Sequence, residues 1–381
     1  MFNHQCLRKP KLVFLFWGAI PPPVEMPVCA LEFYAGIGGL HLALQRSSVD
    51  GTVVQAFDWD PTACQVYRIN HPPKIIKKAD ISQLEAEQIA AYNADLWLLS
   101  PACQPYTVLN PNAKGAADPR AKSFLYLVHE VLPKLKEMDA LPSRLLVENV
   151  AGFEFGVPNS RLRYYFLAKK APLQFIHTAG EDVDRVWRHI PGQGKDWVDD
   201  RFEDPDSSLN SSNNNGDLPL IPNLSPYLDS PDQTSDYSIP DKVLYKWGRL
   251  FDIALPSSHR SCCFTRGYTK LVQGSGSIIQ MNEDFDTTTV FNEFADARPE
   301  GPDAVRILDP LKLRYFTPNE LLRIFGFNSR VDSASTLDSD GNPCSTFKWP
   351  EGVTVKAQYK LIGNSVNVTV VQALIEYLFS E

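Results

Sequence analysis

Short apolar runs alternate with segments of helical spacing through the first 150 residues. Nearly continuous apolar runs predict buried strands, and they fall at 28–34, 52–57, 95–100 and 144–150. Amphipathic spacing predicts helices between and around them, at 40–47, 61–70, 81–92 and 123–138. Strands that alternate with helices usually form a parallel sheet covered by helices. The pattern therefore predicts an α/β fold for this part of the chain.

The alternation stops after residue 150. The next apolar run, 164–168, follows a connection that contains Gly152, Gly156 and Pro158. A crossover to a parallel strand needs about a dozen residues or more and usually a helix. This connection cannot supply a helix. Either the two strands pair antiparallel, or one helix–strand unit is missing after residue 154.

The second half of the chain contains two polar insertions and two further helices. Residues 203–240, rich in Ser, Asn, Asp and Pro, are predicted to be a disordered insertion, and 329–345 form a second polar insertion. A helix over 317–325 begins with a capping box, because Glu320 stands three residues after Thr317. A closing helix is predicted at 368–379.

The first 26 residues look like an appendage. Basic residues precede an apolar run at 12–20, which is the outline of a signal peptide. Cleavage after Ala30, however, would cut the first strand, and the apolar run is too short to span a bilayer. We therefore expect no membrane segment, and Met26 is an alternative start.

Composition and charge exclude several classes of protein. The chain has 381 residues, 44% of them hydrophobic, and a net charge of −8, so it is neither fibrous nor wholly disordered. The negative charge argues against coating nucleic acid by bulk attraction but allows a local basic patch. The seven cysteines are scattered without a Cys-x-x-Cys pair, which argues against a disulfide scaffold or a zinc site. Reduced thiols predict a cytoplasmic or nuclear protein without a metal.

A glycine turn and an acidic strand end point to a nucleoside ligand. Gly36-x-Gly38-Gly39 follows the first strand and opens a helix, without the dinucleotide-binding spacing. Asp58 ends the second strand, where a carboxylate can accept hydrogen bonds from ribose hydroxyls. Trp59 beside it could stack on a purine. Together they predict an adenosine-containing cofactor without a pyrophosphate, although a tight turn and a core tryptophan remain alternatives.

Three polar groups follow strands of the predicted sheet. Cys103 lies in the loop after 95–100, where ligand sites of parallel sheets are found, so a nucleophile and a buried structural thiol are equally supported. Glu148 ends an apolar strand, and its desolvation favours a protonated acid that could donate to a base. Arg161 and Arg163 share one side of a strand, and their guanidinium groups suit bases or phosphates. A turn acid and a solvated strand end are the alternatives.

Five motifs occur in one order along the chain. They are Phe33-Tyr34-Ala35-Gly36-Ile37-Gly38-Gly39, Cys103-Gln104, Glu148-Asn149-Val150, Arg161-Leu162-Arg163 and Gly363-Asn364-Ser365-Val366. From about residue 28 to its end, the chain resembles the cytosine-5 methyltransferase family. Within the family, Cys263-Phe264-Thr265 followed by Tyr268 resembles the branch whose substrate is the anticodon loop of aspartate tRNA.

The resemblance implies a role for each motif. An S-adenosylmethionine pocket would be lined by Tyr34, Gly36, Gly38, Gly39, Asp58, Trp59, Asp80, Pro101, Asn364, Ser365 and Val366. Cys103 would attack carbon 6 of cytosine as a thiolate, and Glu148 would hold a proton on ring nitrogen 3. Arg161 and Arg163 would orient the base and the cysteine. RNA would contact Gln104, Asn149, Cys263, Phe264, Thr265, Arg266 and Tyr268, with Arg260 and Lys270 as further candidates; a solvated basic turn remains the alternative there.

The resemblance also implies a division of the chain and a choice of partners. A Rossmann-like catalytic core would cover 27–190, a small target-recognition domain 191–305, and a returning C-terminal segment 306–381. The partner would be tRNA, bound by a monomer. A DNA cytosine-5 methyltransferase, and a nucleic-acid-binding remnant without turnover, are the competing interpretations.

Two departures from the family pattern stand out. Ala102 replaces the proline that the family places directly before the nucleophile. Relatives also have a helix and a strand in the region of the short 150–158 connection.

The short connection predicts a less stable protein with impaired methyl transfer, because a missing unit exposes apolar surface or removes a pocket wall. Incubation with labelled methyl donor and total tRNA measures the transfer. Turnover comparable with that of an intact relative would contradict this prediction.

Overall fold

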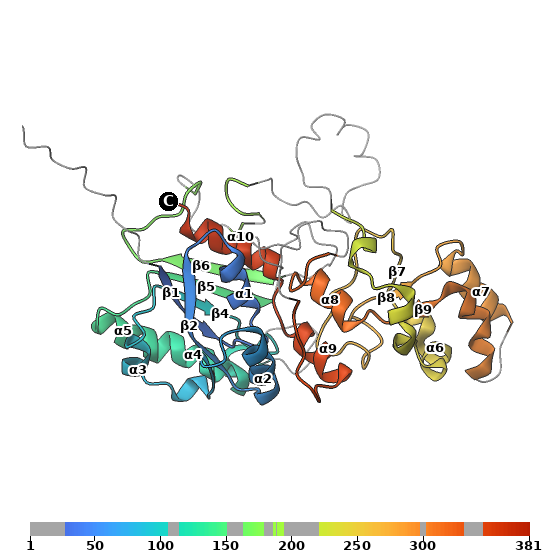
Figure 1. Ribbon diagram of the computed structural model, residues 1–381, viewed down its shortest axis with the longest axis horizontal. Coiled ribbons are helices and arrows are strands. Elements are labelled where there is room, and N and C mark those ends of the chain that lie inside the picture. The colour runs from blue at the N-terminus through green and yellow to red at the C-terminus, as the bar shows by residue number, and fades with distance from the viewer. Residues whose placement is uncertain are drawn as a thin grey trace, which may run out of the picture.

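The computed structural model describes residues 27–105, 114–150, 163–178, 186–187, 189–193, 221–297, 302–330 and 346–381. The predicted appendage, Arg161, the first part of the 203–240 insertion and most of the 329–345 insertion lie outside these ranges. A larger unit, built on a six-stranded sheet, lies beside a smaller unit that carries a three-stranded sheet (Figure 1).

The large sheet has the order β3-β2-β1-β4-β5-β6. Its strands are β1 (Val28–Phe33), β2 (Gly51–Asp58), β3 (Ile76–Lys78), β4 (Leu96–Leu99), β5 (Arg144–Val150) and β6 (Arg163–Lys169). The first five pair in parallel, and β6 pairs antiparallel with β5. The predicted α/β sheet is therefore confirmed.

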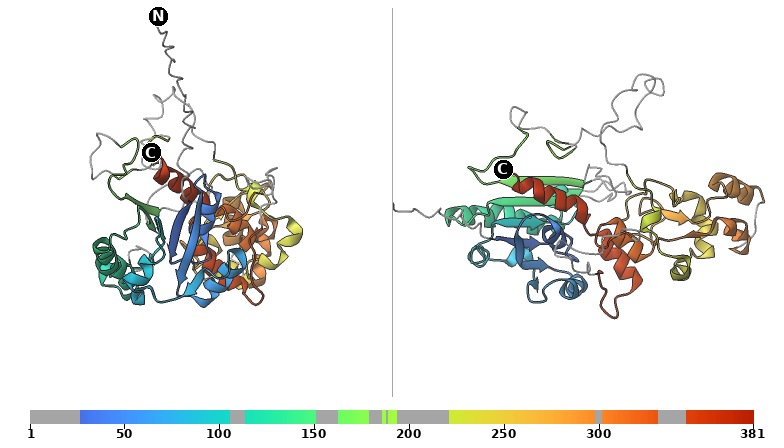
Figure 2. Two further views of the ribbon diagram at one scale, coloured as in Figure 1. Left: turned by 60° about the vertical axis from the view of Figure 1, so that its left-hand side comes forward. Right: turned by 45° about the horizontal axis from the view of Figure 1, so that its top comes forward.

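Helices cover both faces of this sheet. They are α1 (Gly39–Arg46), α2 (Pro61–Asn70), α3 (Ala86–Ala90), α4 (Lys122–Tyr126), α5 (Leu132–Glu137) and α10 (Val368–Phe379). Residues of α1, α2 and α10 belong to one apolar core, and residues of α3 and the α4–α5 region belong to another. Figure 2 shows α10 lying against the sheet beside β6.

Two of the predicted helices differ from the observed ones. Residues 81–92 form a 3-10 turn (Ile81–Gln83) and then α3, because Leu84 between them has an extended backbone. Residues 123–138 form α4 and α5 joined by the π-helical segment Leu127–Val131. Pro133 lacks an amide hydrogen for the preceding turn, and a π turn accommodates such a gap.

The antiparallel alternative for 164–168 is confirmed. The β5–β6 ladder runs without a break from Arg144↔Lys169 to Val150↔Arg163. The sheet thus lacks no interior strand, which corrects the expectation of a gap inside it. Instead β6 is the last strand of the described sheet, and its Tyr164 and Phe166 side chains are 43% and 49% exposed.

The smaller unit has its own apolar core around α7 and the 3-10 helix Pro302–Leu311. Its elements are α6 (Asp241–Trp247), β7 (Ile253–Ala254), β8 (Ile278–Gln280), α7 (Thr287–Asp296) and β9 (Leu313–Arg314). The helices α8 (Pro318–Ile324) and α9 (Val355–Gly363) follow and lead back to α10. The stretch Val355–Phe379 is apolar enough to cross a membrane, but 67% of its most apolar window is buried in the protein, as expected of core helices.

The predicted disorder of 203–240 is wrong for its second half. Residues 221–240 form three short 3-10 turns, Ser225–Tyr227, Pro231–Gln233 and Ser235–Tyr237. Leu224 and Tyr227 are buried in the large core, and Asp229 is buried too. Some polar residues of this segment are exposed, and others, such as Asp229, take part in a buried hydrogen-bond network.

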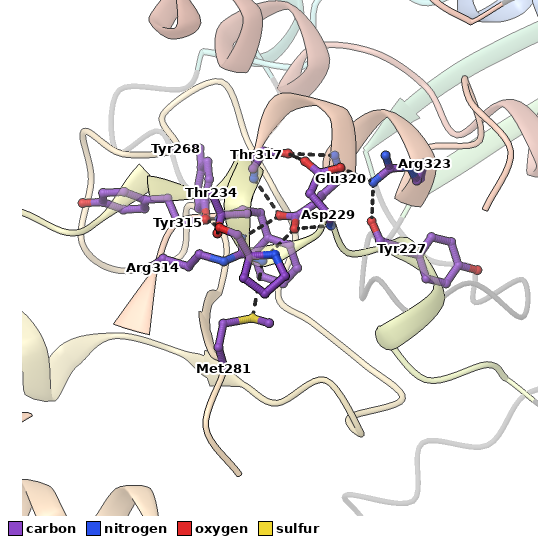
Figure 3. Close-up of polar contacts among 12 residues, drawn as sticks. Tyr227, Asp229, Thr234, Tyr268, Met281, Arg314, Tyr315, Thr317, Glu320 and Arg323 are labelled. Atoms are coloured by element: carbon purple, nitrogen blue, oxygen red, sulfur yellow. Dashed lines mark hydrogen bonds and ion pairs between the residues drawn. The ribbon is translucent and has the colours of Figure 1, made fainter. Parts of the chain in front are cut away.

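That network is centred on Glu320 (Figure 3). The buried Glu320 carboxylate accepts hydrogen bonds from both terminal nitrogens of Arg314, at 2.7 and 2.8 Å. It also accepts the backbone amides of Thr317 at 2.7 Å and Asp229 at 2.8 Å. Asp229 in turn lies 2.7 Å from Arg323 of α8. The predicted capping box at Thr317 is confirmed, and it joins the smaller unit to α8.

Glu320→Gln should destabilise the protein by about 3 kcal/mol, because it leaves the buried Arg314 without a charged partner. The free energy of unfolding in urea measures the change. The control is Asp139→Asn, which breaks the exposed pair with Lys170 and should change the same quantity by less than about 1 kcal/mol. Equal effects of the two variants would contradict the prediction.

Candidate functional site

A cavity of about 400 Å³ opens at the carboxyl ends of the parallel strands. Five separate parts of the sequence line it: the glycine turn after β1, the end of β2, the loop after β4, the facing ends of β5 and β6, and the segment 360–366. Arg266 is the lining residue contributed by the smaller unit. The topology thus brings together the motifs that stand far apart in the sequence.

The glycine turn depends on left-handed backbone conformations and close contacts. Tyr34, Gly36 and Gly38 have φ angles of 59°, 55° and 88°, a region that glycine adopts with the least strain. A Cβ atom on Gly39 would lie 2.7 Å from the Val366 side chain. The absence of that atom lets the returning C-terminal segment close against the turn.

A buried polar cluster lies beneath this turn. His71 packs so closely that a Cβ on Gly38 would lie 2.1 Å from its Nε2, and His41 stacks on His71 with ring centroids 4.2 Å apart. The Tyr67 hydroxyl lies 2.7 Å from His41 Nδ1 and donates to Glu32 at 2.8 Å. Burial raises the pKa of Glu32 to about 8 and lowers the pKa of His41 to about 3 and of His71 to about 4.

The end of β2 presents a carboxylate and an aromatic ring to the cavity. Asp58 accepts the backbone amides of Gly36 and Asp60, each at 2.7 Å, and burial raises its pKa. The Trp59 ring is 68% exposed. A buried acid with further lone pairs, an open ring and a cavity of this size fit the ribose, the base and the bulk of S-adenosylmethionine.

An ion pair spans two walls of the cavity. Lys360 Nζ on α9 lies 2.9 Å from Asp60 Oδ2, and Asp60 also caps α2 as predicted. Sequence reasoning missed both residues as site candidates. The spacing holds a signal for Lys360, because it precedes Asn364 by four residues, which places both on one side of a helix.

The cysteine loop and the acid–arginine pair form the other wall. Arg163 Nε lies 2.8 Å from Glu148 Oε1, and both side chains are nearly buried. Arg163 also interacts electrostatically with Cys103 and Cys263. The Asn149 side chain donates to the Pro101 carbonyl at 3.4 Å, which ties the cysteine loop to β5.

Arg120 is a further basic group near the nucleophile that sequence reasoning missed. It pairs with Asp118 at 2.6 Å and interacts electrostatically with Cys103. Arg163 and Arg120 thus place two guanidinium groups within electrostatic range of Cys103.

The motif of the smaller unit is largely structural. A Cβ on Gly363 would lie 2.2 Å from the Thr265 backbone, so this segment packs directly on α9. Phe264 and Tyr268 are buried. The Tyr268 hydroxyl donates to the Ser277 carbonyl at 2.7 Å and accepts the Phe316 amide at 2.9 Å. Phe264 and Tyr268, which the resemblance places among the RNA contacts, are buried in this structure, and neither ring reaches the surface.

Most of the predicted site residues do meet at the cavity. Those that line it are Tyr34, Gly36, Gly39, Asp58, Trp59, Pro101, Cys103, Gln104, Glu148, Arg163, Arg266, Asn364, Ser365 and Val366. Asp80 does not, because it is exposed and caps the 3-10 turn that follows it. Gly38, Asn149, Cys263 and Thr265 are not among its lining residues. Asn149 bonds to the cysteine loop, and the Thr265 backbone packs on Gly363, which lines the cavity. Arg260 and Lys270 are exposed on the smaller unit.

The fold and the site define an α/β protein in which Cys103 and a glycine-rich turn line one cavity at the carboxyl ends of the parallel strands. The family model described as C-5 cytosine-specific DNA methylase matches residues 29–154 and 151–380, and the chain belongs to this family. The two matched parts meet at 151–154, where the sequence shows its short connection.

The relatives include tRNA and DNA enzymes by name. The chain is 34% identical to the tRNA (cytosine(38)-C(5))-methyltransferase of Schizosaccharomyces pombe, over 91% of this chain and 96% of that one. It is 31% identical to a DNA (cytosine-5)-methyltransferase of Dictyostelium discoideum, over 92% and 94%. A crystal structure of a mutant Spodoptera frugiperda DNMT2 superimposes with a TM-score of 0.70 at 30% identity, covering 93% of this chain and all of that one.

Glu32→Gln should remove a loss of stability that accompanies rising pH between about 4.5 and 8. Because the pKa of Glu32 is raised from 4.5 to about 8, the folded protein holds a proton that the unfolded chain has released, and stability falls as pH rises through that window. The pKa values of His41 and His71 are lowered from 6.5, so these two histidines reduce stability only as pH decreases below 6.5. They therefore do not contribute to the change above pH 6.5. The midpoint of thermal unfolding between pH 6.5 and 8 should decline in the parent protein and stay level in the variant. The exposed Glu137→Gln serves as control, and the same decline in Glu32→Gln would contradict the assignment.

Proposed function

We propose that this protein transfers a methyl group from S-adenosylmethionine to carbon 5 of cytosine in tRNA. The observation that carries the proposal is the convergence of Cys103, Glu148 and Arg163 on one wall of the cavity. Asp58 and Trp59 line the same cavity. Relatives at 30–34% identity that are named tRNA (cytosine(38)-C(5))-methyltransferases support the choice of tRNA.

The residues of the cavity wall have distinct chemical tasks. Cys103 adds as a thiolate to carbon 6 of the base, which makes carbon 5 nucleophilic. Once carbon 5 carries the methyl group, it loses its proton to solvent, the ring double bond re-forms and the thiolate leaves. Glu148 holds a proton toward ring nitrogen 3, so that negative charge developing in the ring is neutralised. Arg163 keeps Glu148 in place and balances the charge of the thiolate. S-adenosylmethionine, when bound, supplies an electrophilic methyl group.

A cytosine must leave its stack to reach Cys103. Leaving the stack requires least free energy in a single-stranded loop, which favours an RNA loop over duplex DNA. Arg266, exposed at the cavity, is placed to contact the phosphate of such a nucleotide. The described cysteines are free thiols, in keeping with a reducing compartment such as the cytoplasm or nucleus.

DNA is the second candidate substrate. The relative named DNA (cytosine-5)-methyltransferase, at 31% identity over 92% of this chain, favours it. A third outcome is a protein that binds the donor without transferring its methyl group.

Cys103→Ala should abolish methyl transfer to tRNA and leave donor binding intact, because the thiol forms the covalent bond to the base. Labelled S-adenosylmethionine is incubated with either total tRNA or genomic DNA. The control Cys29→Ala removes a thiol at the amino end of β1, away from the cavity, and should keep full activity. Transfer to DNA alone would overturn the substrate assignment, and transfer that persists in Cys103→Ala would overturn the mechanism.

A further inference from the structure

The segment that runs through α6 into the next 3-10 turn, Gly248–Leu250, carries a local positive charge. Lys242, Lys246 and Arg249 are all exposed, and no acidic residue stands between 242 and 251. The two flanking acids are engaged elsewhere, since Asp241 pairs with Arg306 and Asp252 accepts the Ser277 hydroxyl. In a chain with a net charge of −8, this cluster is a distinct basic surface.

Aromatic side chains are interleaved with these basic groups. Tyr245 and Trp247 are 40% and 38% exposed on the same short segment. Lys246 Nζ lies 4.7 Å from the centre of the Trp247 ring, so a cation already rests on one part of an exposed indole. Exposed rings beside cations are typical of surfaces that stack unpaired bases.

A hollow of about 250 Å³ adjoins this segment. Among the described residues, Arg249 is the charged residue of its lining, Thr288 and Asn292 are among the polar ones, and no carboxylate contributes. Arg249 is held in place by a 3.1 Å hydrogen bond to Asn292 of α7. The hollow therefore combines an anchored guanidinium with a wall free of negative charge, which suits a phosphate.

We propose that Lys242, Lys246, Trp247 and Arg249 form a second RNA-contacting surface, separate from the cavity, that binds the backbone and an unpaired base of the tRNA. None of these residues lines the cavity that would hold the target cytosine. The surface deepens the proposed function, on which it rests, by assigning part of the tRNA affinity to the smaller unit. The basic groups neutralise phosphates, and the indole supplies the stacking that duplex DNA cannot use.

The test measures binding directly, without methyl donor, so that its outcome does not depend on turnover. Filter binding of labelled total tRNA is compared for the full-length protein, Lys246→Ala/Arg249→Ala, and Trp247→Ala. The matched control is Lys134→Ala/Lys136→Ala, which removes the same charge from exposed positions on α5, at the opposite end of the molecule (Figure 1).

The basic double variant should bind tRNA about tenfold more weakly. The slope of log K against the logarithm of salt concentration should become less steep by about two, because two phosphate contacts are lost. Trp247→Ala should weaken tRNA binding about tenfold at unchanged salt dependence, and leave duplex DNA binding as in the parent protein. The control variant and the unfolding temperatures should stay unchanged.

Three results would overturn the proposal. The first is a loss in the basic double variant no greater than in the control variant. The second is an equal loss of tRNA and duplex DNA binding in Trp247→Ala. The third uses poly-glutamate as a second probe. If the basic double variant binds tRNA as the parent protein does but no longer binds poly-glutamate, the surface belongs to an acidic protein partner. If the parent protein binds tRNA through this surface yet transfers no methyl group, the proposed function fails and the surface stands.

Discussion

The antiparallel pairing of β5 with β6 is the constraint on which the site depends. Glu148 is fixed near the end of β5, and the ladder sets Val150 opposite Arg163. Side chains two residues apart on a strand share one face, so this register brings the Arg163 guanidinium to the Glu148 carboxylate. A slip of one residue would turn Arg163 to the other face. The acid, its cation and the neighbouring cysteine loop therefore depend on the register of a single hairpin-like pair.

Two glycines allow the rest of the chain to close around that pair. Gly39 admits Val366, so the C-terminal segment seals against the first turn of the fold. Gly363 admits the backbone of Thr265, so the smaller unit seals against α9. At both positions the absence of a side chain lets two chain segments approach closely. A Cβ atom on Gly39 or Gly363 would push the walls of the cavity apart. The Glu320 network adds a second attachment, because it joins the smaller unit to α8.

Local signals in the sequence predicted much of the fold and many of the site residues. The Asp60 cap, the Thr317 capping box and the apolar strands depend on neighbours within a few residues, and all are confirmed. Long-range packing decided the rest. Tyr268 looks like a surface aromatic next to basic residues, yet Phe316 and Ser277 bury its hydroxyl. The polar segment around Asp229 looks disordered because its ionic partners lie about ninety residues further along the chain.

The short connection after β5 has a one-sided consequence. On one face of β6, Tyr165 and Leu167 pack into the large core, and Lys169 donates to the Ser380 carbonyl at 2.7 Å, which ties the strand to the end of α10. On the other face, Tyr164 and Phe166 stay largely exposed. At the two ends of the connection, Glu148 of β5 and Arg163 of β6 line the cavity. An exposed aromatic face on an outer strand favours association with other chains. The short connection therefore bears on stability and solubility through the exposed face of β6.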